Sequence, residues 1–312
     1  MTSEPSGLYP APYRLVRPAF KAGPFLCASP HSGRYYPDDF KRASRLDELL
    51  LRRSEDFHVD ELFQLAPDFG APLLMAHYPR AYVDLNRAEN ELDPLLIRDP
   101  LPQSSAMISE RVAAGLGTLA RVVAIGMPIY HEPLSLAEAK ARIARIHTPY
   151  HQALDALLSA AHKHHGWSVL LDCHSMPSKP LRAGESDQHG FDADIVLGDC
   201  HGASCDPRLI NRAEDILHDL GYRVARNDPY AGGYCTQHHG RPDEGRHALQ
   251  IPLAAPASSM PSRADKAFGH KNRIGFHFWV AGACHDTRKN RAGSNTLSGA
   301  SNAGAIRPVQ CG

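Results

Sequence analysis

The sequence lacks an apolar run of about 18 residues, so we expect no membrane-spanning helix. Its start, MTSEPSGLYPAPYRL, has neither the basic residues nor the apolar stretch of a secretory signal, and we therefore expect a cytoplasmic protein. The 34 Lys and Arg balance the 34 Asp and Glu, so no overall field indicates a nucleic-acid or membrane partner. The seven cysteines are odd in number and form no CxxC pair, which argues against a disulfide framework or a cysteine zinc knuckle.

Several catalytic motifs are also absent. The chain has no GxSxG nucleophile elbow, no P-loop and no GxGxxG fingerprint, which argues against a serine hydrolase of that type and against the common nucleotide sites. What the chain does have is histidine, with 19 in 312 residues. Imidazole is the commonest metal ligand and a proton carrier near neutral pH, so the positions of the histidines decide their meaning.

The order of predicted elements indicates an α/β fold. Short apolar runs predict strands, and apolar residues at helical spacing predict helices. The expected strands are 25–29, 72–76, 81–85, 167–173, 193–199, 222–226 and a strand that begins at 247–251. The expected helices are 44–66, about 136–166 and about 207–219, with a break or kink at Pro149. Strands that alternate with helices favour a mixed sheet between helical layers.

Two histidines directly follow predicted strands. His31 comes after strand 25–29 and His174 after strand 167–173, and open α/β sheets place their sites at such strand ends. A strand end holds an imidazole rigidly, as a metal site requires, and Asp172 and Ser175 flank His174 as partners for its ring. The alternative is that both are ordinary loop histidines.

A carboxylate would complete a hydrolytic site with three protein ligands and one open position. Residues 54–61, SEDFHVDE, hold the candidates. His58 and Glu61 have the HxxE spacing that puts both on one helix face, and we interpret this pair as a solvated face. Cys173 is adjacent to His174 but points away from it on an extended chain, which favours a buried filler.

A long polar stretch lies at residues 227–247. It contains the pair Gly232-Gly233, which permits close backbone approach to a ligand, and Thr236, His239 and Arg241, which offer donors to an anion. A polar surface loop is the alternative, but the length of the stretch favours a functional role.

Seven stretches, taken together and in order, resemble the N-formylglutamate amidohydrolases. They are SPHSGRYYP (29–37), VDLNR (83–87), PYH (149–151), DCHSMP (172–177), DIVLGD (194–199), NDPYAGGY (227–234) and HGRP (239–242) running to HALQI (247–251). The resemblance covers roughly residues 20–251. That family is similar in fold to zinc carboxypeptidases and aspartoacylases, which implies a three-layer structure with helices on both faces of a mixed sheet.

The resemblance implies a chemistry as well as a fold. It implies Zn²⁺ as the cofactor, a zinc-bound water that attacks the formyl carbon of an N-acyl amino acid, and release of formate and L-glutamate as in histidine degradation. His31, Asp56 and His174 are the implied zinc ligands, Asp56 because the family carries an acidic residue in that helix. Arg87 and Asn86 would suit the substrate carboxylates, and Thr236, His239 and Arg241 are further candidates.

The resemblance stops between Ile251 and Pro252. In the family the strand continues into a glutamate, and in the related hydrolases a glutamate there is the general base; here position 252 is proline. Residues 1–251 carry a net charge of −6 and residues 252–312 a net charge of +6, and the latter contain no glutamate. We therefore divide the chain into an amidohydrolase-like domain, 1–251, and an atypical Ala/Gly/Ser-rich tail, 252–312, which we expect to be poorly ordered. We hypothesise that a frameshift replaced the original C-terminus.

Three functions follow from the sequence. The first is hydrolysis of N-formyl-L-glutamate, impaired by loss of the general base. The second is a related zinc deacylase that acts on another N-acyl amino acid. The third is a catalytically dead, metal-binding homologue.

Overall fold

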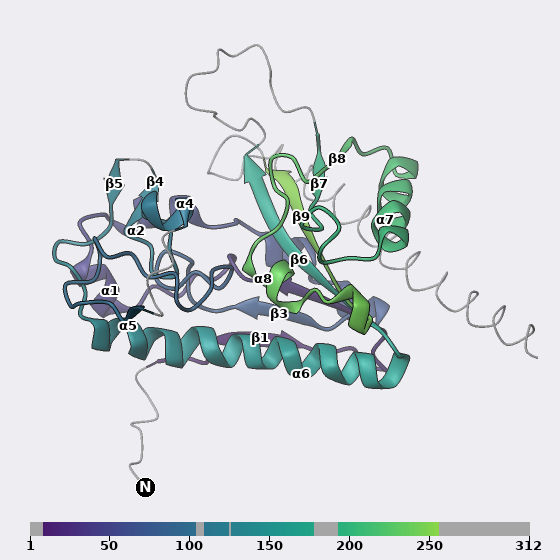
Figure 1. Cartoon of the computed structure of the whole chain (residues 1–312), viewed down its shortest axis with the longest axis horizontal. Helices are drawn as coiled ribbons and strands as arrows, with labels where there is room; N and C mark the ends of the chain where they lie inside the picture. Colours follow the sequence, from purple (N-terminus) through teal and green to yellow (C-terminus); the bar gives the residue numbers. More distant parts are fainter. Residues whose placement is uncertain (1–8, 104–108, 125, 178–192, 256–312) are drawn as a thin grey trace, which may run out of the picture.

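The computed structural model describes residues 9–103, 109–124, 126–177 and 193–255. Its centre is a seven-stranded mixed sheet with the strand order β1-β3-β2-β6-β9-β7-β8 (Figure 1). The strands are β1 (Tyr13–Val16), β2 (Phe25–Ser29), β3 (Leu73–Ala76), β6 (Ser168–Pro177), β7 (Ile195–Leu197), β8 (Val224–Arg226) and β9 (Arg246–Ala255). The four strands β3, β2, β6 and β9 are parallel, whereas β1 and β7 pair antiparallel with them at either side. The predicted α/β fold with a mixed sheet is confirmed.

Side chains of the central strands alternate between two cores. In β2, Leu26 and Ala28 pack into one hydrophobic cluster, and Phe25 and Cys27 into the other. The strand is buried on both faces, as expected for parallel strands between helical layers, which is why its sequence is a continuous apolar run rather than an alternating one.

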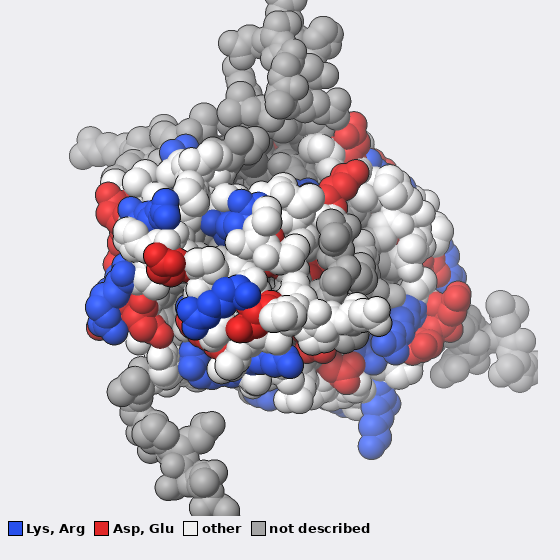
Figure 2. All heavy atoms as spheres, turned by 60° about the vertical axis from the view of Figure 1, so that its left-hand side comes forward, with Lys and Arg blue, Asp and Glu red and all other residues white. Residues whose placement is uncertain are grey.

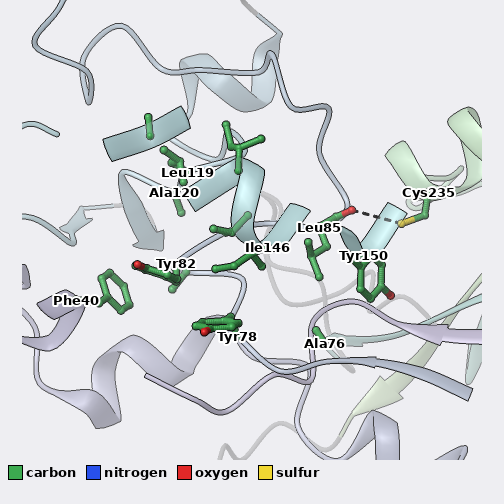
Figure 3. Packing of buried hydrophobic residues seen from close by; sticks show 14 of the residues in the cluster. Phe40, Ala76, Tyr78, Tyr82, Leu85, Leu119, Ala120, Ile146, Tyr150 and Cys235 are labelled. Atoms are coloured by element: carbon green, nitrogen blue, oxygen red, sulfur yellow. Dashed lines mark hydrogen bonds between the residues drawn. The ribbon is translucent and has the colours of Figure 1, made fainter. Parts of the chain in front are cut away.

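Helices cover each face of the sheet. The helix α6 (Thr148–His165) contributes Tyr150, Leu154 and Leu158 to the first cluster, which we call the α6-side core (Figure 3). The helix α7 (Pro207–Asp219) contributes Ile210 and Leu217 to the second, the α7-side core. The predicted helix at 207–219 is confirmed.

The other regular elements are α1 (Asp38–Ala43), α2 (Glu48–Leu51), η1 (Arg52–Ser54), α3 (Val59–Leu62), η2 (Ala66–Phe69), α4 (Glu110–Ala113), β4 (Val122–Ala124), β5 (Met127–Pro128), α5 (Leu136–Arg142), η4 (Ile143–His147), α8 (Tyr234–His239) and η5 (Pro242–Glu244).

Of the break or kink predicted at Pro149, the break does not occur. The π-helical turn η4 joins α5 to α6, and Pro149 lies in the first turn of α6. The wider π turn relieves the clash that the proline ring would make with the carbonyl four residues earlier, so the helix continues through it. Single π turns are common at functional sites, and this one ends at His147.

The single helix predicted over residues 44–66 is also wrong. The segment forms α2, η1 and α3, separated by an extended residue at Glu55 and a left-handed residue at His58 (φ 58°). The backbone N–H of Asp56 donates to the carbonyl of His31 (3.1 Å) instead of to a helical carbonyl. A tertiary contact therefore interrupts the helix and takes Asp56 out of it.

No strand forms at residues 81–85, contrary to the prediction. The N–H groups of Tyr82 and Val83 both donate to the carbonyl of Pro79 (2.9 and 3.2 Å), as in a turn, and the N–H of Asp84 donates to Thr118 (2.7 Å). The run is apolar because the turn is buried in the α6-side core, not because it lies in a sheet.

The strand β9 continues through Pro252 to Ala255. The N–H groups of Gln250 and Ala254 donate to carbonyls on the β7 side, at Gly198 and Asp194 (both 2.8 Å). By the alternation of backbone groups along the strand, the nitrogen of Pro252 also points toward β7. The pairing with β7 is irregular there, so the strand does not need a backbone hydrogen-bond donor at this residue. The domain boundary between residues 251 and 252 stays a prediction, and the predicted tail from residue 256 onward lies outside the described residues.

Charge is distributed evenly over the face in Figure 2, where basic and acidic side chains lie interspersed among neutral ones. Within the described ranges, no helix has the length and apolar character needed to cross a membrane.

Candidate metal and substrate site

Three side chains far apart in the sequence converge at one point. His31, Asp56 and His174 are all buried, and one ligand atom of each lies within 4.8 Å of the others. The Oδ2 of Asp56 is 2.9 Å from Nδ1 of His174 and 3.5 Å from Nδ1 of His31. These are the three residues that the sequence suggested as metal ligands.

The sheet order brings them together. His31 lies in the turn that follows β2, and β2 pairs in parallel with β6, which carries His174. His174 lies inside β6, which continues to Pro177, and not just past a strand end as predicted. Asp56 comes from the break between η1 and α3. Asp172 and His174 are two residues apart on one strand, so both face the α6 side of the sheet.

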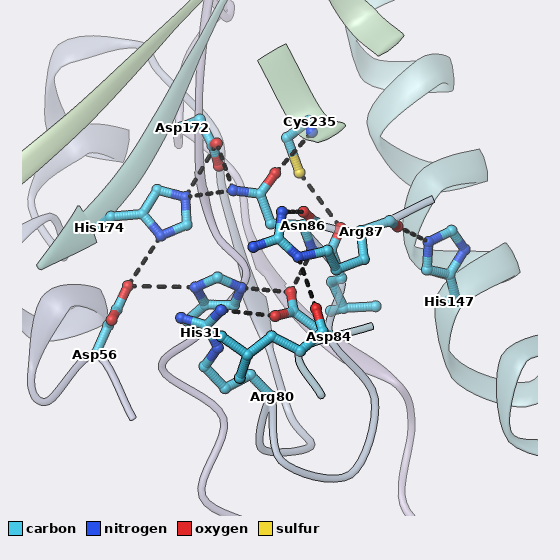
Figure 4. A network of polar contacts seen from close by, with 12 residues as sticks. His31, Asp56, Arg80, Asp84, Asn86, Arg87, His147, Asp172, His174 and Cys235 are labelled. Carbon is cyan, nitrogen blue, oxygen red and sulfur yellow. Dashed lines mark hydrogen bonds and ion pairs between the residues drawn. The ribbon is translucent and has the colours of Figure 1, made fainter. Parts of the chain in front are cut away.

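Each histidine has a carboxylate behind its ring (Figure 4). Nε2 of His31 is 2.7 Å from Oδ1 of Asp84, and Nε2 of His174 is 3.0 Å from Oδ2 of Asp172. An ionised carboxylate only accepts hydrogen bonds, so each Nε2 carries a proton. The nitrogen left for a metal ion is Nδ1 in both rings, and in His174 the ion would take the place of the proton shared with Asp56 (2.9 Å). Metal-binding histidines are commonly oriented in this way.

The charges around the two rings favour a cation. Burial raises the pKa of Asp56, but the hydrogen bond to His174 and the nearby ring of His31 outweigh burial and hold the pKa well below its usual range. Burial lowers the pKa of His174, but Asp172 and Asp56 raise it to about 10. The buried carboxylates thus demand positive charge, which either an imidazolium or a metal ion in its place would provide.

The donor set fits zinc. Two imidazole nitrogens and one carboxylate oxygen are a common catalytic zinc set, and three protein ligands leave one position open. Nδ1 of His31 is buried and makes no hydrogen bond to any described residue, which is the state expected of an atom that faces a metal ion.

The segment from Asp84 to Arg87 is fixed from several sides. Asp84 accepts hydrogen bonds from Arg80 (2.7 Å) and from the N–H of Asn86 (2.8 Å). The side-chain NH2 of Asn86 donates to Oδ2 of Asp172 (3.4 Å), the carboxylate behind His174, and its amide oxygen accepts from the N–H of Cys235 (2.8 Å). Asn86 therefore links the candidate metal site to α8 through Asp172.

Two histidines of the η4–α6 helix hold the backbone on either side of Asn86. Nε2 of His151 donates to the carbonyl of Leu85 (2.9 Å), and Nε2 of His147 donates to that of Arg87 (2.8 Å). Nδ1 of His151 accepts from Nε2 of His239 (3.1 Å). Burial is the main cause that lowers the pKa of His151 to about 2 and of His239 to about 3, so this cluster stays neutral.

A pocket of about 390 Å³ opens over the three candidate ligands. Its walls include the guanidinium groups of Arg80, Arg87 and Arg111 together with Gln250 and Pro252. Tyr230 to Tyr234, including the predicted pair Gly232-Gly233, form another wall. A concave site with several cations and a candidate metal is suited to a small anionic ligand.

Comparison with known proteins agrees with this geometry. The profile of the N-formylglutamate amidohydrolase family matches residues 23–256. The chain is similar to N-formylglutamate deformylases from Pseudomonas aeruginosa (32% identity, 76% of this chain and 83% of the relative) and Pseudomonas putida (30%, 74% and 80%). It is also similar to the crystal structure of N-formylglutamate amidohydrolase from Ralstonia eutropha JMP134, with a TM-score of 0.80, 34% identity and coverage of 90% of this chain and 99% of that one.

The chain belongs to the N-formylglutamate amidohydrolase family. It is an amidohydrolase by membership in that family, and the family match extends across Pro252 to residue 256. Position 252, where the family resemblance implied a glutamate, is in the pocket wall and pairs with His174 in the sheet.

The other residues suggested by the sequence are placed as follows. Arg87 and Asn86 line the pocket. Thr236 and His239 are buried within α8, where Thr236 donates to the carbonyl of Gly233 (2.8 Å), and neither lines the pocket. Arg241 is half exposed and forms an ion pair with Glu244 (3.8 Å), away from the pocket lining.

His58 and Glu61, which we interpreted as part of a solvated face, are exposed in the structure. His58 and Glu61 form an ion pair 2.9 Å long, with 46% and 44% of their side chains exposed, and are separate from the site. Cys173 packs in the α7-side core, on the opposite face of β6 from His174.

Four residues in or beside the pocket, Asp84, Gln250, Arg80 and Arg111, were not among the predicted site residues. Asp84 and Gln250 lie in stretches that resemble the family, so the family motif was the available signal for them. Arg80 follows a Pro in a segment we assigned to no element, and Arg111 lies outside every recognised stretch. No local pattern pointed to these two arginines.

Proposed function

We propose that this chain binds one zinc ion through His31, Asp56 and His174, and that the site acts on the formamide bond of N-formyl-L-glutamate to give formate and L-glutamate. The observation that carries the proposal is the convergence of these three ligands, each histidine backed by a carboxylate. The named relatives support the substrate, since two of them are N-formylglutamate deformylases.

Zinc, when bound, would supply Lewis-acid chemistry to the formyl carbonyl and to a water molecule. The chain's own residues orient the reactants. Asp84 and Asp172 fix the tautomers of the two imidazoles, and Asn86 donates a hydrogen bond to Asp172 (3.4 Å). Such fixed orientation of the ligands is a requirement for catalysis at a metal site.

Arg87 is the proposed contact for a substrate carboxylate. Its Nε donates to the carbonyl of Leu116 (3.1 Å) and its Nη1 to that of Asn86 (3.3 Å), so backbone groups orient the guanidinium without neutralising it. An oriented guanidinium pairs with a carboxylate through two parallel hydrogen bonds.

Pro252 is the reason to expect slow turnover. The resemblance implies a general base at this position, and proline has no group that takes a proton. A general base contributes about 10²–10⁴-fold to rate. The specific observation in favour of a second candidate, a metal-binding homologue without activity, is that Pro252 occupies the pocket wall beside His174.

Two measurements on the purified full chain test the proposal. Zinc content is determined by elemental analysis, and formate release is followed with N-formyl-L-glutamate, N-acetyl-L-glutamate and N-formyl-L-methionine. We expect about one zinc per chain and slow formate release that is specific for N-formyl-L-glutamate. Zinc with no turnover on any compound favours the inactive homologue, preference for another acyl group favours a related deacylase, and absence of zinc binding contradicts all three.

A further inference from the structure

Three arginines converge on the pocket over the candidate metal ligands. Three guanidinium groups, of Arg80, Arg87 and Arg111, line one cavity of about 390 Å³. The acidic residues in its lining are Asp56, which faces the two histidines, and Glu91. Glu91 keeps its negative charge, but its two oxygens are held by the N–H of Ala88 (2.9 Å) and by the hydroxyl of Ser109 (3.0 Å), and it forms no ion pair with a described arginine.

The three arginines differ in the ion pairs and hydrogen bonds that their guanidinium groups make with the rest of the protein. Arg80 forms an ion pair with Asp84 (2.7 Å), so its charge is already matched (Figure 4). Arg87 donates to two backbone carbonyls and keeps its charge. Among the described residues, no carboxylate forms a hydrogen bond with Arg111. Within the described part of the chain, Arg87 and Arg111 therefore line the pocket without an ion pair of their own.

The crowding of these cations has an electrostatic cost. Partial burial lowers the pKa of Arg111, and the nearby guanidinium groups of Arg87 and Arg80 lower it further. Like charges in a partly enclosed site repel one another, and a bound anion relieves that repulsion. Arg111 reaches the pocket from the short helix α4, while its side chain remains accessible to solvent.

We infer that Arg111 is a specificity-determining residue that binds the second carboxylate of a dianionic N-acyl amino acid, while Arg87 binds the first. This inference rests on the proposed function and extends it, because Arg111 makes the site select dicarboxylates over N-acyl amino acids with a neutral side chain. A site with an unpaired cation binds a neutral amide weakly, since the amide leaves that cation without a partner.

The test compares N-formyl-L-glutamate with N-formyl-L-glutamine, which has nearly the same shape and one charge fewer. The ratio of affinities for the two is measured on the zinc-loaded full chain and on the Arg111→Met variant. If turnover is slow, the ratio is calculated from Kd values measured by calorimetry. If turnover is fast enough to follow, the ratio of the kcat/KM values is used instead. Arg14→Met, at an exposed position on β1 outside the pocket lining, is the matched control.

We expect the unaltered chain and Arg14→Met to prefer the glutamate compound by roughly tenfold or more. Arg111→Met should lose most of that preference by weakening only the glutamate compound, with the glutamine compound changed less than about twofold. If Arg111→Met keeps the preference, or binds both ligands more weakly to the same extent, the role of Arg111 is contradicted while the proposed substrate stands. If the unaltered chain binds neither ligand, the proposed substrate fails together with this inference.

Discussion

Pro252 and His174 are paired residues on the neighbouring parallel strands β9 and β6, and both line the same pocket. By the alternation of side chains, Gln250 and Asp172 occupy the same face one pleat earlier. The side chain at position 252 therefore lies beside the candidate metal site, and proline has no group that can take up or release a proton there.

Replacement of Pro252 by Glu should increase formate release. A carboxylate beside His174 supplies the missing proton acceptor, with an expected gain of about 10²–10⁴-fold in kcat. The matched control is Pro252→Gln, which has the same size without the basic group and should leave kcat near that of the unaltered chain. An equal gain in both variants would show that removal of proline, rather than the carboxylate, was responsible.

Substitution of a predicted zinc ligand should abolish metal binding. We expect His174→Ala or Asp56→Ala to lower zinc content from about one ion per chain to near none, because two donors are too few for a stable site. Elemental analysis after dialysis measures the change. His58→Ala removes a histidine from the exposed pair with Glu61 and should retain full zinc content; its loss of zinc would contradict the assignment.

The carboxylates behind the two rings should tune metal affinity. Asp84→Asn keeps a hydrogen-bond acceptor for Nε2 of His31 but removes the charge, and zinc affinity is expected to fall about 10–100-fold. Competition with a chromophoric chelator gives the affinity. Asp68→Asn, in η2 outside the site, is the control with the same chemical change. Equal affinities in the two variants would argue that Asp84 has no electrostatic role.

Gly233→Ala should disturb the site through Asn86. A Cβ at this glycine would overlap the side-chain amide of Asn86, which lies against Nε2 of His174. We expect lower zinc affinity and a lower melting temperature than in the unaltered chain, as for other overpacked positions. In an Asn86→Ala background the same change should have little further effect, and an undiminished effect there would place its cause elsewhere.

The buried histidine cluster should make stability depend on pH. In the unfolded chain a histidine binds a proton below about pH 6.5, whereas folded His239 stays neutral until about pH 3, chiefly because of burial. The unfolded chain then binds more protons, so this contribution to stability is complete above about pH 6.5 and is lost as pH falls toward 3. Each such histidine contributes a slope of about 1.4 kcal/mol per pH unit.

Urea denaturation of the metal-free chain between pH 7.5 and 4.5 measures that slope. His239→Gln, which keeps a donor for Nδ1 of His151, should reduce the slope by about 1 kcal/mol per pH unit. His131→Gln, at an exposed position, should leave it unchanged. A slope in His239→Gln equal to that of the unaltered chain would contradict the neutral state of this cluster.

The sequence by itself determined the α/β class, most strands, the helix at 207–219 and the two histidines of the site. These features have local causes: buried parallel strands are continuous apolar runs, and an amphipathic helix repeats its apolar residues at a fixed spacing. The family motifs added Asp56, Asn86 and Arg87.

Only the tertiary structure decided where those residues lie and what they contact. No continuous helix forms around Asp56, because the N–H of Asp56 donates to the carbonyl of His31. The apolar run before Asp84 is a buried turn rather than a strand. Asp84 backs His31, and Arg80 and Arg111 reach the pocket, because segments distant in sequence meet over the adjacent strands β2, β6 and β9. Such contacts depend on strand order and long-range packing, which no local spacing of residues encodes.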